Sequence, residues 1–185
     1  LVSANTTYTI TSDIEGWGTC FNITASNITL DCQGYTIAGN QAGYGINISG
    51  QDSITVRDCR ITNFTRGISL YLTDNSDFSN ITIIRNNGDY AGIYSGTSNS
   101  INFIGLNMTL NNASRNAGLY LVASDDWTVS DSIFAMNNVT SVSGIRAGAI
   151  VGLYSESDMN TFRNITISGN NVTTTSKGPD GATNG

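Results

Sequence analysis

Four residues with carboxylate or amide side chains recur along the chain at similar intervals: Asp74, Asn99, Asp125 and Asp158. The third is followed directly by Asp126 and Trp127. Clustered carboxylates can bind calcium, or can act as the acid and base that cleave a glycosidic bond, and an aromatic ring beside them offers a platform for a sugar. Asp125, Asp126 and Trp127 therefore form a candidate ligand face. The alternative, which we favour, is a row of Asx turns that begin successive strands.

Most other catalytic chemistries lack the residues they need. The chain has no His, which excludes Ser-His-Asp and Cys-His catalysis and every zinc site that contains His. Its three Cys include no Cys-x-x-Cys pair, and no glycine-rich loop leads into a helix. We therefore expect no enzyme activity, no metal site and no cofactor.

The composition narrows the range of partners. The formal net charge is −6 and no basic cluster occurs, which argues against nucleic acid and against anionic membrane surfaces. No window approaches the roughly 18 apolar residues that span a bilayer, so membrane insertion is not expected. The 185 residues suffice for one domain.

Two independent markers show that the chain is a repeat. The segment 78–87 returns as 162–171 with seven of ten residues identical, and weaker copies lie between them. Each copy ends in an Asn-Asn pair, and the first members of these pairs are Asn86, Asn111, Asn137 and Asn170. A second marker, Gly followed by an apolar residue, recurs at Gly45, Gly67, Gly92, Gly118 and Gly152. A period of about 25 residues indicates a solenoid.

Between the markers, short alternating runs are separated by Gly, Asn, Asp and Ser, as expected for strands of three to five residues. The fold predicted is an all-β, single-stranded parallel β-helix of about six to seven coils. Phe78, Phe103, Val129 and Phe162 would form one inward column, and the four first asparagines (86, 111, 137 and 170) an asparagine ladder. We expect the domain over 1–172, with an N-terminal strand and turn segment at 1–19, a loop insertion at 139–151 and a polar tail or linker at 173–185.

Asn-x-Ser/Thr sequons are abundant, although an alternating strand pattern such as Asn-Ile-Thr also creates them. Eleven occur, at Asn5, Asn22, Asn27, Asn47, Asn63, Asn80, Asn107, Asn112, Asn138, Asn164 and Asn171. We expect covalent N-linked glycans at several of them, which implies export to the cell surface or medium. Neighbouring coils would place some of these glycans about 5 Å apart, so partial occupancy is expected.

Two stretches carry a resemblance to a known group. Residues 20–34 and 54–64 resemble coils of right-handed parallel β-helix repeat proteins, the pectate-lyase-like or NosD-like group common among exported archaeal surface proteins. This resemblance implies a right-handed coil and a surface or secreted setting. It does not indicate an activity, because the group mixes enzymes, adhesins and structural proteins. It also implies a disulfide between Cys20 and Cys32. The rival pair is Cys32 and Cys59, because adjacent coils bring Cα atoms within disulfide range.

These observations lead to two classes of function. A β-helix has two ends with unpaired backbone, and neither end of this repeat offers a capping helix. We therefore expect a non-enzymatic extracellular structural protein that associates head-to-tail into a homo-oligomer or filament. The alternatives are a polysaccharide-binding or polysaccharide-cleaving domain that uses the candidate ligand face, and one module of a larger adhesin.

Overall fold

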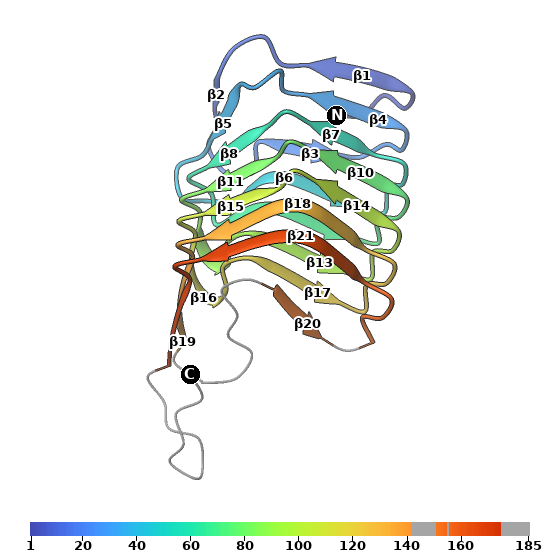
Figure 1. Ribbon diagram of the computed structural model, residues 1–185. Coiled ribbons are helices and arrows are strands. Elements are labelled where there is room, and N and C mark those ends of the chain that lie inside the picture. The colour runs from blue at the N-terminus through green and yellow to red at the C-terminus, as the bar shows by residue number, and fades with distance from the viewer. Residues whose placement is uncertain (142–150, 155, 175–185) are drawn as a thin grey trace.

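The fold is a parallel β-helix. The structure, a computed structural model, describes residues 1–141, 151–154 and 156–174. Every regular element among them is a β-strand, and every strand pair is parallel. The chain winds through successive coils that stack on one another (Figure 1). The predicted all-β solenoid is confirmed.

The largest sheet, sheet A, forms two of the faces of each coil. Its first face consists of β1 (Thr6–Thr9), β4 (Ile28–Asp31), β7 (Thr55–Arg57), β10 (Ser76–Ser79) and β14 (Ile101–Ile104). Its second face consists of β2 (Ile14–Glu15), β5 (Thr36–Ala38), β8 (Arg60–Thr62), β11 (Thr82–Ile84) and β15 (Asn107–Thr109). The long strands β18 (Thr128–Ala135) and β21 (Thr161–Ser168) run through both faces and join them into one sheet.

Two further sheets complete the coils. Sheet B contains β3 (Phe21–Ile23), β6 (Tyr44–Ser49), β9 (Arg66–Tyr71), β13 (Ile93–Gly96), β17 (Leu119–Val122) and β20 (Val151–Tyr154). Sheet C contains β12 (Asn87–Tyr90), β16 (Asn112–Asn116), β19 (Asn138–Ser141) and β22 (Asn171–Thr174). The six strands of sheet B define five full turns within the described chain, with partial turns before and after them. The expected number of six to seven coils agrees with this if the partial turns are counted as coils.

Residues 1–19, which the expected domain over 1–172 includes, are part of the solenoid, because β1 pairs with β4 and β2 pairs with β5. Two other expected boundaries shift. The expected loop at 139–151 is strand at both ends, in β19 and β20, and residues 142–150 lie outside the described residues. The expected tail begins as strand, since β22 extends to Thr174, and residues 175–185 also lie outside the described part.

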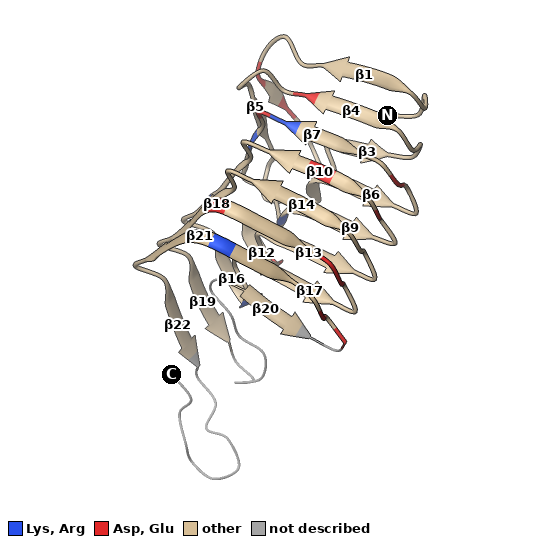
Figure 2. Ribbon diagram, turned by 45° about the vertical axis from the view of Figure 1, so that its right-hand side comes forward, with Lys and Arg blue, Asp and Glu red and all other residues tan. Residues whose placement is uncertain are grey.

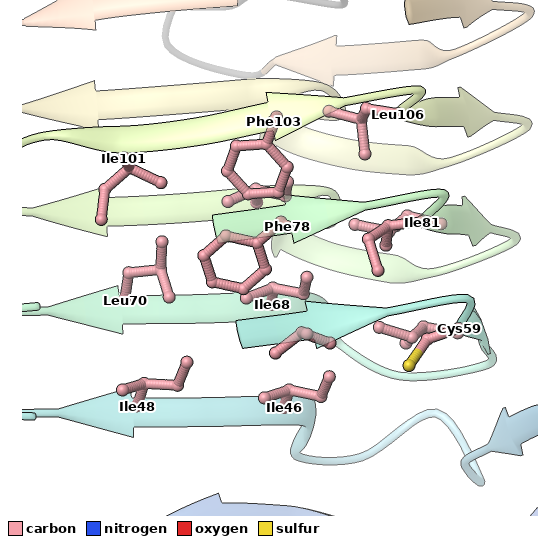
Figure 3. Close-up of a cluster of buried hydrophobic side chains, with 14 of the residues drawn as sticks. Ile46, Ile48, Cys59, Ile68, Leu70, Phe78, Ile81, Ile101, Phe103 and Leu106 are labelled. Atoms are coloured by element: carbon pink, nitrogen blue, oxygen red, sulfur yellow. The ribbon is translucent and has the colours of Figure 1, made fainter. Parts of the chain in front are cut away.

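The core consists of columns of like side chains. Phe78 pairs in register with Phe103, Phe103 with Val129, and Val129 with Phe162, as the repeat predicted. The rings of Phe78 and Phe103 stack with centroids 4.5 Å apart. Ile81 and Leu106 form a neighbouring column, and Ile46, Ile68 and other sheet B residues face them across the interior (Figure 3). The stack therefore buries its apolar side chains along one continuous core.

Several of the marker glycines lie where adjacent coils approach closely. A Cβ atom added at Gly92 would lie 2.1 Å from the carbonyl oxygen of Gly118 and 2.2 Å from Cε of Met108. Only glycine fits at such a distance. The interval between marker glycines increases from 22 residues (45 to 67) to 25 residues (67 to 92). The added residues form β12, and sheet C begins there.

Candidate functional site

The recurring carboxylates join one coil to the next. Oδ1 of Asp74 accepts the backbone N–H of Asn99 at 2.7 Å, and Oδ1 of Asn99 accepts that of Asp125 at 3.0 Å. Oδ1 of Asp125 accepts the backbone N–H of Asp158 at 2.6 Å. Each side chain is thus used as a turn acceptor for the following coil, and not as part of a cluster. Among the described residues no group of three or more His, Cys, Asp or Glu could hold a metal ion.

The candidate ligand face of Asp125, Asp126 and Trp127, the less favoured interpretation of these residues, is contradicted by the burial of Trp127. Trp127 is fully buried, its ring stacks on Phe103 with centroids 5.6 Å apart, and its Nε1–H donates to the carbonyl oxygen of Ser98 at 2.7 Å. The left-handed turn at Asp126, with φ of 57°, precedes the strand and directs the next side chain inward. Trp127 is therefore a core residue. Asp126 stays exposed, without an aromatic platform beside it.

The four first asparagines form a ladder, of which Asn86, Asn111 and Asn137 are fully buried and Asn170, in the last coil, is partly exposed. Nδ2 of Asn86 donates to Oδ1 of Asn111 at 3.2 Å, Nδ2 of Asn111 to Oδ1 of Asn137 at 3.1 Å, and Nδ2 of Asn137 to Oδ1 of Asn170 at 3.1 Å. The same Oδ1 atoms accept the backbone N–H of the preceding coil, as in the 3.0 Å bond from Asn86. The amides also bond to carbonyl oxygens such as that of Ile83, at 2.9 Å. This inner ladder leaves few of its polar groups unsatisfied, which is what burial requires.

The second asparagines form another ladder on the outside of sheet C, which the sequence had not indicated. Nδ2 of Asn112 donates to Oδ1 of Asn87 at 3.3 Å, and Nδ2 of Asn138 to Oδ1 of Asn112 at 2.9 Å. Nδ2 of Asn171 continues the series to Asn138 at 2.9 Å. We call Asn87, Asn112, Asn138 and Asn171 the outer ladder. The recurrence of a second Asn in each Asn-Asn pair could have indicated this ladder. We had expected these residues in a turn, but each of them is the first residue of a strand.

The disulfide joins adjacent coils. Cys32 is bonded to Cys59, with their Cα atoms 4.9 Å apart, so the expected pair Cys20 and Cys32 is wrong. Cys32 directly follows β4 and Cys59 lies beyond β7, and these strands pair side by side. Cys20 lies before β3 on the other side of the coil, as a free thiol. Partial burial raises the pKa of the Cys20 thiol, which makes it a weaker nucleophile at neutral pH.

All eleven sequon asparagines are at least partly exposed, and several are stacked on one another. Asn112, Asn138 and Asn171 are successive members of the outer ladder, and Asn47 donates from Nδ2 to Oδ1 of Asn22 at 2.8 Å. Asn5 and Asn27 precede the paired strands β1 and β4, so they too are neighbours.

Asn80 and Asn164 differ, because their side chains bond to Asp58 and Asp131 at the equivalent positions of the adjacent coils and not to another sequon asparagine. The remaining sequons, Asn63 and Asn107, are half-buried. The stacked and the solitary sequons thus form two distinct classes.

A tyrosine–arginine cluster occupies the seam between sheets B and C. Its members are Tyr44, Arg66, Tyr90, Tyr94, Arg115 and Tyr120. The guanidinium carbon of Arg66 lies 4.5 Å from the ring centroid of Tyr94 and 4.8 Å from that of Tyr44. Burial lowers the pKa of Arg66, against the opposing effect of the surrounding tyrosines and Asp89. The sequence did not indicate this cluster, because its members come from six different strands.

Charged residues are few. Figure 2 shows acidic positions at several successive turns along one edge of the stack, and isolated basic positions elsewhere. One ion pair is found in the described part of the chain: Arg57 at the end of β7 bonds to Asp31 at the end of β4, at 2.8 Å. The pKa of Asp31 is lowered first by the backbone N–H of Gln33 and then by Arg57.

Comparison with known proteins decides the family. The sequence model of one protein family, described as the right handed beta helix region, matches residues 3–184, which is nearly the whole chain. The chain belongs to the right-handed β-helix family. No curated protein and no solved structure matched it. Membership establishes the handedness and the repeat, and an activity has to be argued from this chain's own residues.

The polar residues that recur from coil to coil in this β-helix belong to the asparagine ladders or accept hydrogen bonds at turns. The described residues contain no helix that is long and apolar enough to cross a membrane. Coil stacking does not account for the two ends of the stack.

Proposed function

We propose that this β-helix is a non-enzymatic structural protein of the cell exterior that associates head-to-tail into a homo-oligomer or filament. The observation that carries the proposal is the exposure of core columns at the C-terminal coil. Ile167 is 55% exposed, whereas Phe134 and Met108, which precede it in the same column, are fully buried. In sheet B, Leu153 is exposed above the fully buried Leu121. This coil presents apolar side chains that a further coil would cover.

The N-terminal coil presents a matching surface. An open hollow of about 260 Å³ at this end is lined mostly by side chains of the first coil. Among them are Leu1, Tyr8, Ile10, Ile14 and Phe21. Tyr8 begins the same column that ends at Phe162, since Tyr8 pairs with Leu30 and Phe162 with Val129. The strand β1 of one copy would therefore continue the stack above β21 of another.

The occupant we assign to each end is a second copy. Every strand pair between coils in the described part of the chain is parallel, and a second copy would reproduce such a contact with the same columns. A contact between opposite ends is heterologous, and heterologous contacts that do not close generate filaments. The Cys32–Cys59 disulfide and the exposed sequons support an oxidising, extracellular setting. The use of Asp74 and Asp125 as turn acceptors supports a non-enzymatic role.

Ile167→Asp tests the end-to-end contact. A carboxylate placed in the apolar contact is buried without a partner, so we expect the association constant to fall at least about a hundredfold. The measurement is sedimentation velocity of the 185-residue chain over a wide concentration range. Ile133→Asp is the matched control, because Ile133 is similarly exposed but lies on the side of the stack, and it should leave association unchanged. Equal melting temperatures for both variants would show that the monomer fold is intact.

Two results would contradict the proposal. The unmodified chain could stay monomeric at the highest concentration reached, or both variants could weaken association equally. Either outcome would mean that the exposed columns of the end coils are not the contact.

N-glycans should follow the two classes of sequon. We expect high occupancy at the solitary Asn80 and Asn164 and partial occupancy at Asn112, Asn138 and Asn171, where neighbouring side chains are about 4.8 Å apart. Glycopeptide mass spectrometry of the exported protein measures this. Asn138→Gln should raise occupancy at Asn112 and Asn171 and leave Asn80 unchanged. Full occupancy of all three ladder sites, or unmodified Asn at every site, would contradict the expectation.

A further inference from the structure

One large aromatic side chain of the first coil lies almost entirely in solvent. Trp17 is 89% exposed and follows β2, which lies toward one end of the stack (Figure 1). The turn that carries it is nonetheless held against the second coil, because the backbone N–H of Gly16 donates to the carbonyl oxygen of Ala38 at 2.9 Å. A Cβ atom added at Gly43 would lie 2.3 Å from the carbonyl carbon of Gly18. The backbone that carries the indole is therefore already ordered, and a contact through Trp17 would cost little backbone entropy.

Trp17 occupies the position that the inner ladder occupies in later coils. It stands two residues after β2, just as each inner-ladder asparagine stands two residues after β11, β15, β18 or β21. The second and third coils place Asn40 and the buried Phe64 there, two residues after β5 and β8. This position of the coil therefore holds an indole in the first coil and a side-chain amide in the last.

In the later coils this amide donates to a carbonyl oxygen of the coil before it. Nδ2 of Asn137 donates to the carbonyl oxygen of Met108 at 2.8 Å, and Nδ2 of Asn170 to that of Phe134 at 2.7 Å. Met108, Phe134 and Ile167 are register partners, so the next acceptor of the series is the carbonyl oxygen of Ile167. No later coil of the described chain stacks on β21 to supply the donor.

An indole N–H already does the work of an asparagine amide elsewhere in the chain. Trp127 and Asn160 directly precede β18 and β21, which pair in register, so the two residues hold the same position in adjacent coils. Nε1 of Trp127 donates to the carbonyl oxygen of Ser98 at 2.7 Å, and Nδ2 of Asn160 to that of Ser124 at 3.1 Å. Both bonds reach back to the preceding coil. A tryptophan can therefore continue a series of asparagine donors in this fold.

The last coil also offers an apolar surface for the ring. Ala113, Val139 and Val172 form one column of sheet C, and they pack into a small apolar cluster. Ala113 and Val139 are buried, whereas Val172, in the last coil, is half-buried. Its strand, β22, directly follows the ladder position, but the first coil contributes no strand to sheet C. A second copy stacked on the last coil would thus bring Trp17, and not a strand, beside Val172.

We propose that Trp17 anchors the contact between two copies of this chain: its Nε1–H donates to the carbonyl oxygen of Ile167 in the neighbouring copy, and its ring covers Val172 of that copy. This inference rests on the end-to-end association proposed above, and it names the residue that sets its register. Tryptophan is enriched among the residues that dominate binding energy, because it buries a large apolar area and still offers one donor. A copy stacked in another register would separate the indole from its acceptor.

Sedimentation velocity of the 185-residue chain tests the anchor. We expect Trp17→Ala to weaken association at least about tenfold. Trp17→Phe keeps a ring without the N–H, so it should weaken association less than Trp17→Ala does. Tyr71→Ala is the matched control, because Tyr71 is 50% exposed but lies on the side of the stack, at the end of β9. It should leave association unchanged, and equal melting temperatures would show that all three variants fold.

Fluorescence follows the anchor directly. The chain contains two Trp, and Trp127 is buried within each copy. Association should therefore move the emission of the unmodified chain to shorter wavelength as its concentration rises, by burying Trp17. Trp17→Ala should show no such shift, since only the buried indole remains.

Mixing two defective chains tests which ends meet. Trp17→Ala retains an intact last coil and Ile167→Asp retains an intact first coil, so an equimolar mixture should form one-to-one dimers that do not grow further. If Ile167→Asp weakens association but Trp17→Ala does not, or if the emission stays constant while the chain associates, the anchor is overturned and the end-to-end contact stands. A mixture without dimers would also overturn the anchor. An unmodified chain that stays monomeric would overturn both the anchor and the end-to-end contact.

Discussion

Replacing Asn111 by alanine is expected to lower the free energy of unfolding by about 4 kcal/mol. Asn111 is fully buried in the middle of the inner ladder. Its Oδ1 accepts the backbone N–H of Asn86 at 3.0 Å, and its Nδ2 donates to the carbonyl oxygen of Ile83 at 2.9 Å. Alanine leaves both backbone groups buried without partners, at about 1–3 kcal/mol each, and adds a small cavity.

The neighbouring residue supplies the control. Asn112→Ala removes a member of the outer ladder, but Asn112 is exposed and water can replace its bonds, so the loss should stay near or below about 1 kcal/mol. Urea unfolding followed by circular dichroism measures both variants. Similar losses for Asn111→Ala and Asn112→Ala would show that burial does not distinguish the two ladders. An unfolding transition that separates into two steps would indicate local loss of coils, as expected of a solenoid.

The sequence predicted those features that repeat in every coil. The column of Phe78, Phe103, Val129 and Phe162 and the inner ladder each place one residue type at one position of successive coils. Stacking of like residues converts a sequence interval directly into a spatial contact. The intervals need not be equal for this, because the added residues between 67 and 92 form β12 and leave the columns in register.

The sequence did not determine which residues of adjacent coils lie side by side when their positions do not repeat. The observed Cys32–Cys59 disulfide was only the rival pair. The expected Cys20–Cys32 disulfide would close a single coil, but Cys20 lies on the sheet B side while Cys32 and Cys59 follow adjacent strands of sheet A. A shift of two residues in the alignment decides between these pairs. The tyrosine–arginine cluster was missed for a related reason. Tyr44 and Arg66 are register partners on β6 and β9, but Tyr94 pairs with Ser69, so the cluster does not place one residue type at one position of successive coils.

The error at Trp127 shows how a turn reverses an assignment. An aromatic residue after two aspartates indicated a surface site, because the neighbours are polar. The left-handed backbone at Asp126 changes the direction of the chain, and β18 begins with its alternate side chains directed inward. Left-handed residues recur at equivalent turns of other coils, at Ser100 and Asn75 for example. Turn conformation, more than local polarity, therefore determines which face a residue takes in this fold.

Trp127→Ala is accordingly expected to destabilise the fold, by about 3–5 kcal/mol. The substitution opens a cavity beside Phe103 and leaves the carbonyl oxygen of Ser98 without its donor. Trp17→Ala is the matched control, since Trp17 is 89% exposed and its loss should change stability by less than about 0.5 kcal/mol. Because the chain contains two Trp, each variant retains one indole for fluorescence-detected urea unfolding. Unchanged stability of Trp127→Ala would overturn the place of Trp127 in the core.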